Sequence, residues 1–368
     1  MELSEAEAHL LETQRDFAQN ALLSWFASHA RWLPWRENRS PYQVWVSEIM
    51  LQQTQVETVQ SYFQRFIERF PTPEALATAP LEAVLKVWEG LGYYSRARAL
   101  HRAARQVLEH HQGQLPTDPE TLRTLPGIGP YTAGAIASLA FNIPVPAVDG
   151  NVRRVLARVL ALDAPAPGQL ESIVRSWLPD QNPGAFNEAL MELGALVCRP
   201  RRPQCTTCPW RELCRAYALG QPEKFPAAKA RKTLPHYDVV AAVTIREDRR
   251  ILVAQRRPED MLGGLWEFPG GKRKEGESLE AALRRELQEE MGITLEVGAQ
   301  IEVVRHAYTH FRITLYAYQC RLIAGEPQCI ECADFKWATL EDLRALPMAV
   351  TDRRIARTVE QQLGAQEG

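Results

Sequence analysis

The sequence lacks any apolar run of about 18 residues, which is the length that a membrane-spanning helix needs. It also lacks the basic start, apolar stretch and cleavage site of a signal peptide, because residues 1–17 read as an acidic amphipathic helix. The first absence excludes an integral helical membrane protein, and the second gives no sign of secretion. We therefore expect a reducing, intracellular setting.

An excess of charge of either sign is also missing. The 43 Lys and Arg residues nearly balance 45 Asp and Glu residues, which leaves a net charge of −2. A nucleic-acid partner would therefore have to be bound by local basic patches. For any one patch taken alone, a solvated helix face is the simpler interpretation. Three groups of arginines are candidates: Arg96, Arg98, Arg102 and Arg105; Arg153, Arg154 and Arg158; and Arg199, Arg201 and Arg202.

Strand-like alternation is absent from about residue 18 to residue 219, where apolar residues recur at helical spacing between proline-bearing breaks. The following segment is rich in proline and basic residues and reads as a linker. Beyond it, runs of β-branched and aromatic residues alternate with two helical segments, residues 278–292 and 351–363. We predict a helical domain over residues 1–220, a linker over 221–236 and a smaller α+β domain over 237–368.

Cysteine is sparse except in one stretch, where four of the seven lie close together. Intervals of six, two and five residues separate Cys198, Cys205, Cys208 and Cys214. Such a group can bind one tetrahedral ion or one iron–sulfur cluster, and the ligand count alone does not distinguish zinc from iron–sulfur. The remaining three, Cys320, Cys329 and Cys332, lie more than 100 positions further on.

A short glycine-rich segment, residues 125–129, lies between two predicted helices. Leu125, Gly127 and Gly129 belong to a tight hairpin whose backbone N–H groups suit a phosphate oxygen and read no base sequence. A plain interhelical turn explains the spacing equally well. The motif resembles the helix-hairpin-helix of DNA repair glycosylases.

About twenty residues later, Asp149 precedes a predicted helix in the segment Val-Asp-Gly-Asn-Val. An Asp at this position is most often a helix N-cap. The alternative role is an anion beside a sugar that develops positive charge. The order of hairpin, Val-Asp-Gly-Asn-Val and four cysteines resembles the endonuclease III superfamily over about residues 25–218. The resemblance implies that the cysteines hold a 4Fe–4S cluster and that Arg199, Arg201 and Arg202 face DNA phosphates.

Within that superfamily, the residues at two positions determine which reaction a member catalyses. Members with lyase activity carry a lysine after the hairpin, whereas this chain has Tyr131, and a phenol cannot form a Schiff base. The segment around Glu48, residues 45–56, looks like that of the MutY family of adenine DNA glycosylases. A Glu in a helix is usually solvated, but its apolar neighbours Val46, Ile49 and Met50 predict partial burial, which raises a carboxyl pKa.

These residues predict a monofunctional glycosylase. Adenine leaves poorly as an anion, so Glu48 is the candidate acid that protonates the base, and Asp149 would balance the positive charge left on the sugar. The resemblance further implies that Tyr131 and Asn151 help to hold Asp149. It also implies that Gln53 and Tyr93 enter the base stack, although Tyr93 reads equally well as a core aromatic at a helix end.

The C-terminal domain resembles the Nudix hydrolase MutT, as does the C-terminal domain of MutY proteins. The residues Tyr308, Thr309 and His310 look like the loop with which those proteins recognise 8-oxoguanine, although a hairpin end also explains them. A complete Nudix box runs from Gly271 to Ile293. Its carboxylates Glu286, Glu289 and Glu290 lie at helical spacing and suit Mg²⁺.

The leading prediction is an adenine DNA glycosylase that excises adenine mispaired with 8-oxoguanine or guanine. We expect double-stranded DNA with such mispairs as the partner, a monomer without membrane attachment, and a cytoplasmic, nucleoid-associated location in bacteria. Three alternatives stay open: a bifunctional protein that also hydrolyses oxidised nucleoside triphosphates, a nucleotide-pool Nudix hydrolase tethered to DNA, and a pyrimidine-lesion glycosylase/lyase. Tyr131 in place of lysine argues against the last.

Overall fold

The computed structural model describes residues 5–227 and 233–364, with side chains from residue 13 onward. Its contacts divide the chain into two compact units, one of Met1–Ala77 with Arg102–Ala230 and one of Thr78–His101 with Arg231–Gly368. Part of the predicted linker, residues 228–232, lies outside the described residues. In the described chain, no helix combines the length and the apolar character needed to cross a membrane.

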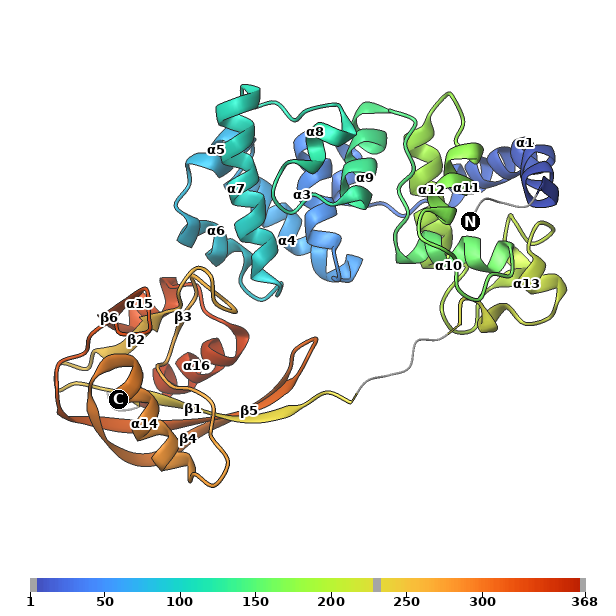
Figure 1. The fold of residues 1–368 in the computed structure, drawn as a ribbon. Helices are drawn as coiled ribbons and strands as arrows, with labels where there is room; N and C mark the ends of the chain where they lie inside the picture. The colour runs from blue at the N-terminus through green and yellow to red at the C-terminus, as the bar shows by residue number, and fades with distance from the viewer. Residues whose placement is uncertain (1–4, 228–232, 365–368) are drawn as a thin grey trace. The chain divides into compact units, whose positions relative to one another are not determined.

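The first unit is built almost entirely from α-helices, as the spacing of apolar residues predicts (Figure 1). Proline opens many of the helices, since its missing N–H has no intrahelical partner at the first turn. The helices are α1 (Glu5–His29), α2 (Pro34–Glu37), α3 (Pro41–Leu51), α4 (Val56–Arg69), α5 (Pro73–Thr78), α7 (Tyr94–His111), α8 (Pro119–Arg123), α9 (Pro130–Phe141), α10 (Gly150–Val159), α11 (Gln169–Trp177), α12 (Pro183–Leu196) and α13 (Arg215–Ala218). Of these, α5 and α7 run across the division between the units.

One hydrophobic core joins the two ends of this unit's sequence. Buried side chains of α1, including Ala18 and Leu22, pack with those of α10, α11 and α12 and with Trp210. The indole N–H of Trp210 donates to the carbonyl of Ala18 at 2.9 Å. The segment that contains the four clustered cysteines is therefore fixed to the N-terminal helix.

The second unit holds two small sheets with helices against them (Figure 1). One sheet has the order β1-β5-β4 and the other β3-β2-β6. The strands are β1 (His236–Thr244), β2 (Ile251–Gln255), β3 (Trp266–Glu267), β4 (Thr294–Ala307), β5 (Arg312–Ala324) and β6 (Asp334–Ala338), and the helices are α6 (Leu81–Trp88), α14 (Leu279–Met291), α15 (Leu340–Ala345) and α16 (Val350–Gly364).

The alternation of side chains along β1 explains how α14 and α16 cover this unit. Val240 and Ala242 lie in the core that includes the buried side chains of α14. Ala241 and Val243 lie in the core that includes those of α16. Because successive residues of a strand point to opposite faces, the two helices cover opposite faces of β1. The predicted fold class, a helical domain followed by an α+β Nudix-like domain, is confirmed.

Candidate active site

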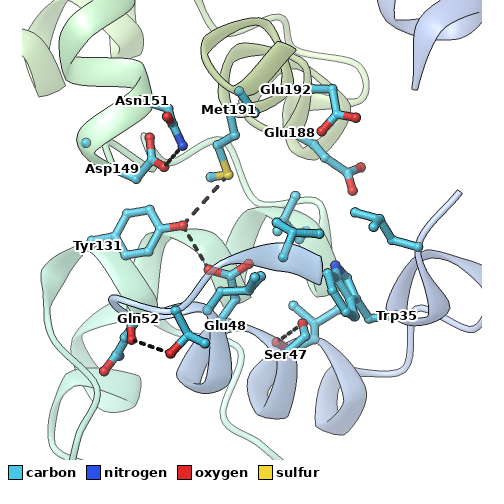
Figure 2. A pocket seen from close by; sticks show the side chains of 18 of the residues that line it. Trp35, Ser47, Glu48, Gln52, Tyr131, Asp149, Asn151, Glu188, Met191 and Glu192 are labelled. Atoms are coloured by element: carbon cyan, nitrogen blue, oxygen red, sulfur yellow. Dashed lines mark hydrogen bonds between the residues drawn. The ribbon is translucent and has the colours of Figure 1, made fainter. Parts of the chain in front are cut away.

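A cavity of about 660 Å³ opens among the helices of the first unit (Figure 2). Its volume lies within the usual range of ligand pockets. Four residues singled out from the sequence line it together: Glu48 on α3, Tyr131 on α9, Asp149 before α10, and Asn151 on α10. Three segments spaced over about a hundred positions therefore converge on one site.

Glu48 is buried, with 5% of its surface exposed, as its apolar neighbours in the sequence predict. The Tyr131 hydroxyl donates a hydrogen bond to its Oε2 at 2.9 Å. Burial raises the pKa of Glu48 to about 7, and the nearby Asp149 and Glu188 act in the same direction, whereas the Tyr131 bond opposes them. A carboxyl with this pKa is poised to exchange a proton near neutral pH.

Asp149 is the N-cap of α10. Its side chain accepts hydrogen bonds from the Val152 amide at 2.7 Å and from Asn151 Nδ2 at 2.9 Å. Burial raises the pKa of Asp149, while both hydrogen bonds favour the charged form and oppose that shift. The capping role and a role in the cavity therefore coexist in one side chain.

Tyr131 lies between the two carboxyl groups, as Figure 2 shows. Burial, reinforced by the neighbouring Glu48 and Asp149, raises the pKa of Tyr131 well above its ordinary value. The phenol therefore stays protonated and acts as a hydrogen-bond donor. Its hydroxyl also lies 3.8 Å from Met191 Sδ on α12.

A network of arginines and glutamates forms another part of the lining, and the sequence analysis missed it. Arg31 donates to both carboxylate oxygens of Glu192 at 2.9 Å each, and Arg36 pairs with Glu188 at 2.6 Å and with Glu192 at 3.2 Å. Burial alone would raise the pKa of Glu192, but the bonds from Arg31 and Arg36 lower it to about 2. Glu192 is therefore a fixed negative charge.

A signal for this network was present in the sequence. Glu188 and Glu192 stand four residues apart in α12, whose other residues are largely apolar and buried. Two carboxylates on the same face of a buried helix require cationic partners. The partners come from residues 31–39, about 150 positions away, and no local pattern identifies them.

Gly194 on α12 allows that helix to approach α10 closely. A Cβ atom at this position would lie 2.6 Å from Asn151 Cβ, closer than such atoms approach in proteins. The absence of a side chain at Gly194 therefore leaves room for Asn151, which donates to Asp149.

The predicted hairpin lies between α8 and α9. Gly127 adopts a φ of 83°, which a residue with a side chain rarely tolerates, and Gly129 is the N-cap of α9. Both glycines are exposed. Leu125 differs from the expectation of a DNA contact, because its side chain is buried and its N–H bonds the Leu122 carbonyl at 3.1 Å. Leu125 packs the hairpin onto the core and leaves Gly127 and Gly129 outward.

The four clustered cysteines line a second, smaller cavity of about 20 Å³. Apolar side chains, including Val155, Leu193 and Trp210, surround them. The guanidinium of Arg158 lies 3.4 Å from Cys198 Sγ and can donate to a thiolate there. Among the described residues, no set of three or more His, Cys, Asp or Glu side chains is arranged for a single metal ion. Four thiols that line one apolar cavity beside a guanidinium fit thiolate ligation of an iron–sulfur cluster.

Two arginines grouped in the sequence as a basic patch serve a different purpose. Arg158 is only 2% exposed and donates to the carbonyls of Phe225, Arg199 and Pro200 at 3.1, 2.6 and 2.9 Å. Arg154 donates to the Cys198 carbonyl at 2.7 Å and to Asn151 Oδ1 at 2.8 Å. Arg154 and Arg158 are therefore neither residues of a solvated helix face nor contacts for a DNA phosphate. Hydrogen bonds through Arg154 and Asn151 connect the cysteine segment to Asp149.

In the second unit, two predicted DNA-reading residues lie together. The hydroxyl of Tyr93 lies 2.8 Å from the hydroxyl of Thr309, and both residues are exposed. Tyr308 is instead partly buried against the core and packs edge-on against His306, while His310 is exposed. Thr309 and His310 therefore present their side chains to solvent and Tyr308 supports the loop.

Two of the three Nudix-box carboxylates on α14 share one arginine partner. Arg285 donates to Glu286 at 2.8 Å and to Glu289 at 3.0 Å. Burial raises the pKa of Glu290 to about 8, and the neighbouring Glu267 and Glu286 add to the shift. Glu286 and Glu290 lie close enough for their charges to interact, and Mg²⁺ at the Nudix box stays a prediction.

Comparison with known proteins relates this geometry to two families. Residues 46–180 match the HhH-GPD superfamily of base excision DNA repair proteins, and residues 240–358 match the NUDIX domain. The adenine DNA glycosylase of Rattus norvegicus is 36% identical over 92% of this chain and 77% of its own length. This chain belongs to the adenine DNA glycosylase family. The human adenine DNA glycosylase is 35% identical over 94% of the chain and 74% of its own length.

A solved structure supports the fold of the helical part. A thermostable thymine-DNA glycosylase superposes with a TM-score of 0.52 and 27% identity, over 56% of this chain and 98% of its own. The expectation of a DNA N-glycosylase with a Nudix domain is therefore confirmed. The roles of individual residues in this adenine DNA glycosylase family member follow from its own geometry.

We expect Glu48→Gln to change how stability depends on pH. Because folding raises the pKa of Glu48 above its unfolded value, its contribution is complete at acid pH and is lost as pH rises toward about 7. The Gln variant has no such loss. Its free energy of unfolding, measured in urea, should gain roughly 2 kcal/mol over wild type between about pH 5.5 and pH 8.5. The exposed Glu68→Gln is the control, and parallel pH profiles for all three proteins would contradict the assignment.

We expect Arg158→Met to destabilise the first unit strongly. The change leaves three buried carbonyls without their donor, which costs about 3–5 kcal/mol in total. Denaturant unfolding followed by tryptophan fluorescence measures the loss. Arg153→Met, one helical turn away and exposed, should change the free energy of unfolding by less than about 0.5 kcal/mol. Equal effects of the two substitutions would rule out the anchoring role of Arg158.

Proposed function

We propose that this chain excises adenine mispaired with 8-oxoguanine or guanine in double-stranded DNA, as a monofunctional glycosylase. The observation that carries the proposal is the convergence of Glu48 and Asp149 on one cavity, joined through Tyr131. The two carboxyls have different partners, which is the arrangement that acid catalysis and charge stabilisation require. The family membership supports adenine as the base.

Glu48 is proposed as the acid. An expelled adenine anion is a poor leaving group, and protonation at N7 makes the base a better one. Because burial raises the pKa of Glu48 to about 7, a large part of the carboxyl carries a proton at neutral pH. The Tyr131 hydroxyl bonds Oε2 and leaves Oε1 of Glu48 to face the base. After transfer, the carboxylate of Glu48 can activate a water molecule.

Asp149 is proposed as the anion that stabilises the positive charge on the sugar. Hydrogen bonds from the Val152 amide and from Asn151 fix its carboxylate and support its charge. A preorganised anion of this kind needs no reorganisation when positive charge develops. Tyr131, a neutral donor, lies between Asp149 and Glu48 (Figure 2).

The arginine–glutamate network suits recognition of the flipped base. Glu188 and Glu192 offer carboxylate acceptors on the cavity lining, and the exocyclic amino group of adenine is a donor. Arg31 and Arg36 hold these carboxylates in place. Thymine carries an acceptor at the corresponding position, so the same network would disfavour it.

Gln53 and Tyr93 are proposed to enter the base stack. Both are exposed and both adopt left-handed backbone conformations, with φ of 58° and 48°. Such conformations cost about 1–3 kcal/mol for residues other than glycine and cluster at functional sites. Gln53 also lines the cavity that contains Glu48.

Thr309 is proposed to read the opposite base. The N7 of 8-oxoguanine carries a hydrogen, whereas the N7 of guanine is an acceptor, and a hydroxyl oxygen can accept from the former. The position of Tyr93 beside Thr309 places a stacking ring next to this hydroxyl.

The cysteine segment is proposed to hold a 4Fe–4S cluster through Cys198, Cys205, Cys208 and Cys214. Four thiols around one apolar cavity with an arginine donor fit thiolate ligation. When bound, the cluster would cross-link the segment covalently and has no step in base removal. The exposed Arg199, Arg201 and Arg202 would then be held toward DNA phosphates.

We expect Glu48→Gln to abolish adenine release while leaving DNA binding intact. Loss of a general acid costs roughly 10²–10⁴-fold in rate. The measurement is single-turnover release from a duplex with adenine opposite 8-oxoguanine. The wild-type rate should fall as pH rises through about 7, since the protonated carboxyl is the active form. Glu68→Gln should match wild type, and full release by the Glu48 variant would remove this residue from the mechanism.

We expect Thr309→Val to slow release opposite 8-oxoguanine by about tenfold, the equivalent of one hydrogen bond. Release opposite guanine should be unchanged, because guanine lacks the N7 hydrogen. Thr309→Ser keeps the hydroxyl and should retain the preference. If the Val variant lost the same factor opposite both bases, Thr309 would act through loop structure and not through recognition of the oxidised base.

A further inference from the structure

Two cysteines of the second unit take no part in the proposed function. Cys329 and Cys332 lie between β5 and β6, and their Sγ atoms are 2.8 Å apart. This is longer than the S–S bond of about 2.05 Å and close enough for direct reaction. The two residues form a Cys-x-x-Cys sequence, a spacing that recurs in reversible dithiols.

The backbone around the pair is held in place on both sides. The amides of Ile330 and Glu331 donate to the carbonyl of Glu290 at 3.1 and 3.3 Å, at the end of α14. The amide of Ala333 donates to the carbonyl of Gln255 at 2.8 Å, and Arg257 donates to the carbonyl of Ile330 at 2.6 Å. Little conformational entropy is therefore lost when the two sulfurs join, because the loop already holds them together.

The two thiols differ in access to solvent. Cys329 is exposed, whereas Cys332 is partly buried. The Cys332 thiol donates a hydrogen bond to the sulfur of Cys329. Burial raises the pKa of Cys332 to about 12. Cys329 is therefore the sulfur that meets a reagent first, and Cys332 is the partner that resolves the product.

We propose that Cys329 and Cys332 are a redox-active dithiol that forms an intramolecular disulfide by exchange with a low-molecular-weight disulfide. The Cys329 thiolate attacks one sulfur of the small disulfide, and a mixed disulfide forms as one small thiolate leaves. Cys332 then attacks the Cys329 sulfur, and the second small thiolate leaves. The protein loses two protons and two electrons, and the small disulfide takes them up to become two thiols.

The resulting disulfide joins two cysteines that are three positions apart on one loop. Closure also fixes residues 329–332 against the carbonyl of Glu290 and so restrains the end of α14.

The test uses the full-length protein and oxidised glutathione as the small disulfide. Trypsin releases residues 322–336, a peptide that contains Cys329 and Cys332 and no other cysteine. After treatment, alkylation and digestion, this peptide should carry no alkyl group and be lighter than the reduced peptide by two hydrogens. Buried Cys320, in the separate peptide 313–321, is the internal control and should stay reduced.

Single substitutions separate the two steps. Cys332→Ser should accumulate a stable glutathione adduct on Cys329, and Cys329→Ser should react at least tenfold more slowly, because the remaining thiol is partly buried. Both positions lie on a loop, so both variants should fold with wild-type thermal unfolding profiles. Full alkylation of the treated wild-type peptide, or a stable glutathione adduct on it, would overturn the proposal. Equal adduct formation by both variants would overturn the assigned order of attack.

Discussion

The hydrogen bond from Tyr131 to the buried carboxyl of Glu48 joins α9 to α3, and the site depends on it. Burial alone disfavours the charged carboxylate, and the phenol donor partly offsets that effect. The result is a pKa of about 7, where both protonation states are accessible at neutral pH. The same donor holds one carboxylate oxygen of Glu48, a residue that lines the cavity. The hydrogen bond from Tyr131 therefore influences both the position and the pKa of the Glu48 carboxyl.

Three carboxyl groups of one cavity differ because their partners differ. Glu192 is bound by two guanidinium groups and has a pKa of about 2. Asp149 accepts hydrogen bonds from neutral donors, with a smaller contribution from the charge of Arg154, and Glu48 accepts one from a single phenol. Hydrogen bonds from two guanidinium groups lower the pKa of Glu192, whereas burial raises the pKa values of Asp149 and Glu48. Arg31 and Arg36 are bound to Glu192 and Glu188, so the carboxyl groups of one cavity differ in their charge at neutral pH.

Site residues that belong to a local motif could be predicted from the sequence. Residues whose role depends on a partner far away in the sequence could not. Glu48, Tyr131, Asp149 and Asn151 were predicted, and the structure brings them together. Strand β3 has only two residues, which is too short to show a period in the sequence. Leu125 was misjudged because a hairpin motif does not say which of its residues faces the core. Arg158 was misread because arginine is ordinarily exposed, and only tertiary structure shows carbonyls gathered around it.

The buried arginines change how a nearly neutral chain can bind DNA. Arg31, Arg36, Arg154 and Arg158 are bound internally, so they supply little free charge for phosphates. The arginines of the cysteine segment, in contrast, are exposed. Arg158 bonds the carbonyls of Arg199 and Pro200 from the inside of that segment. The buried charge of Arg158 thus fixes the backbone of the segment that contains Arg199, Arg201 and Arg202. A loop held in this way would lose less conformational entropy on binding a phosphate backbone.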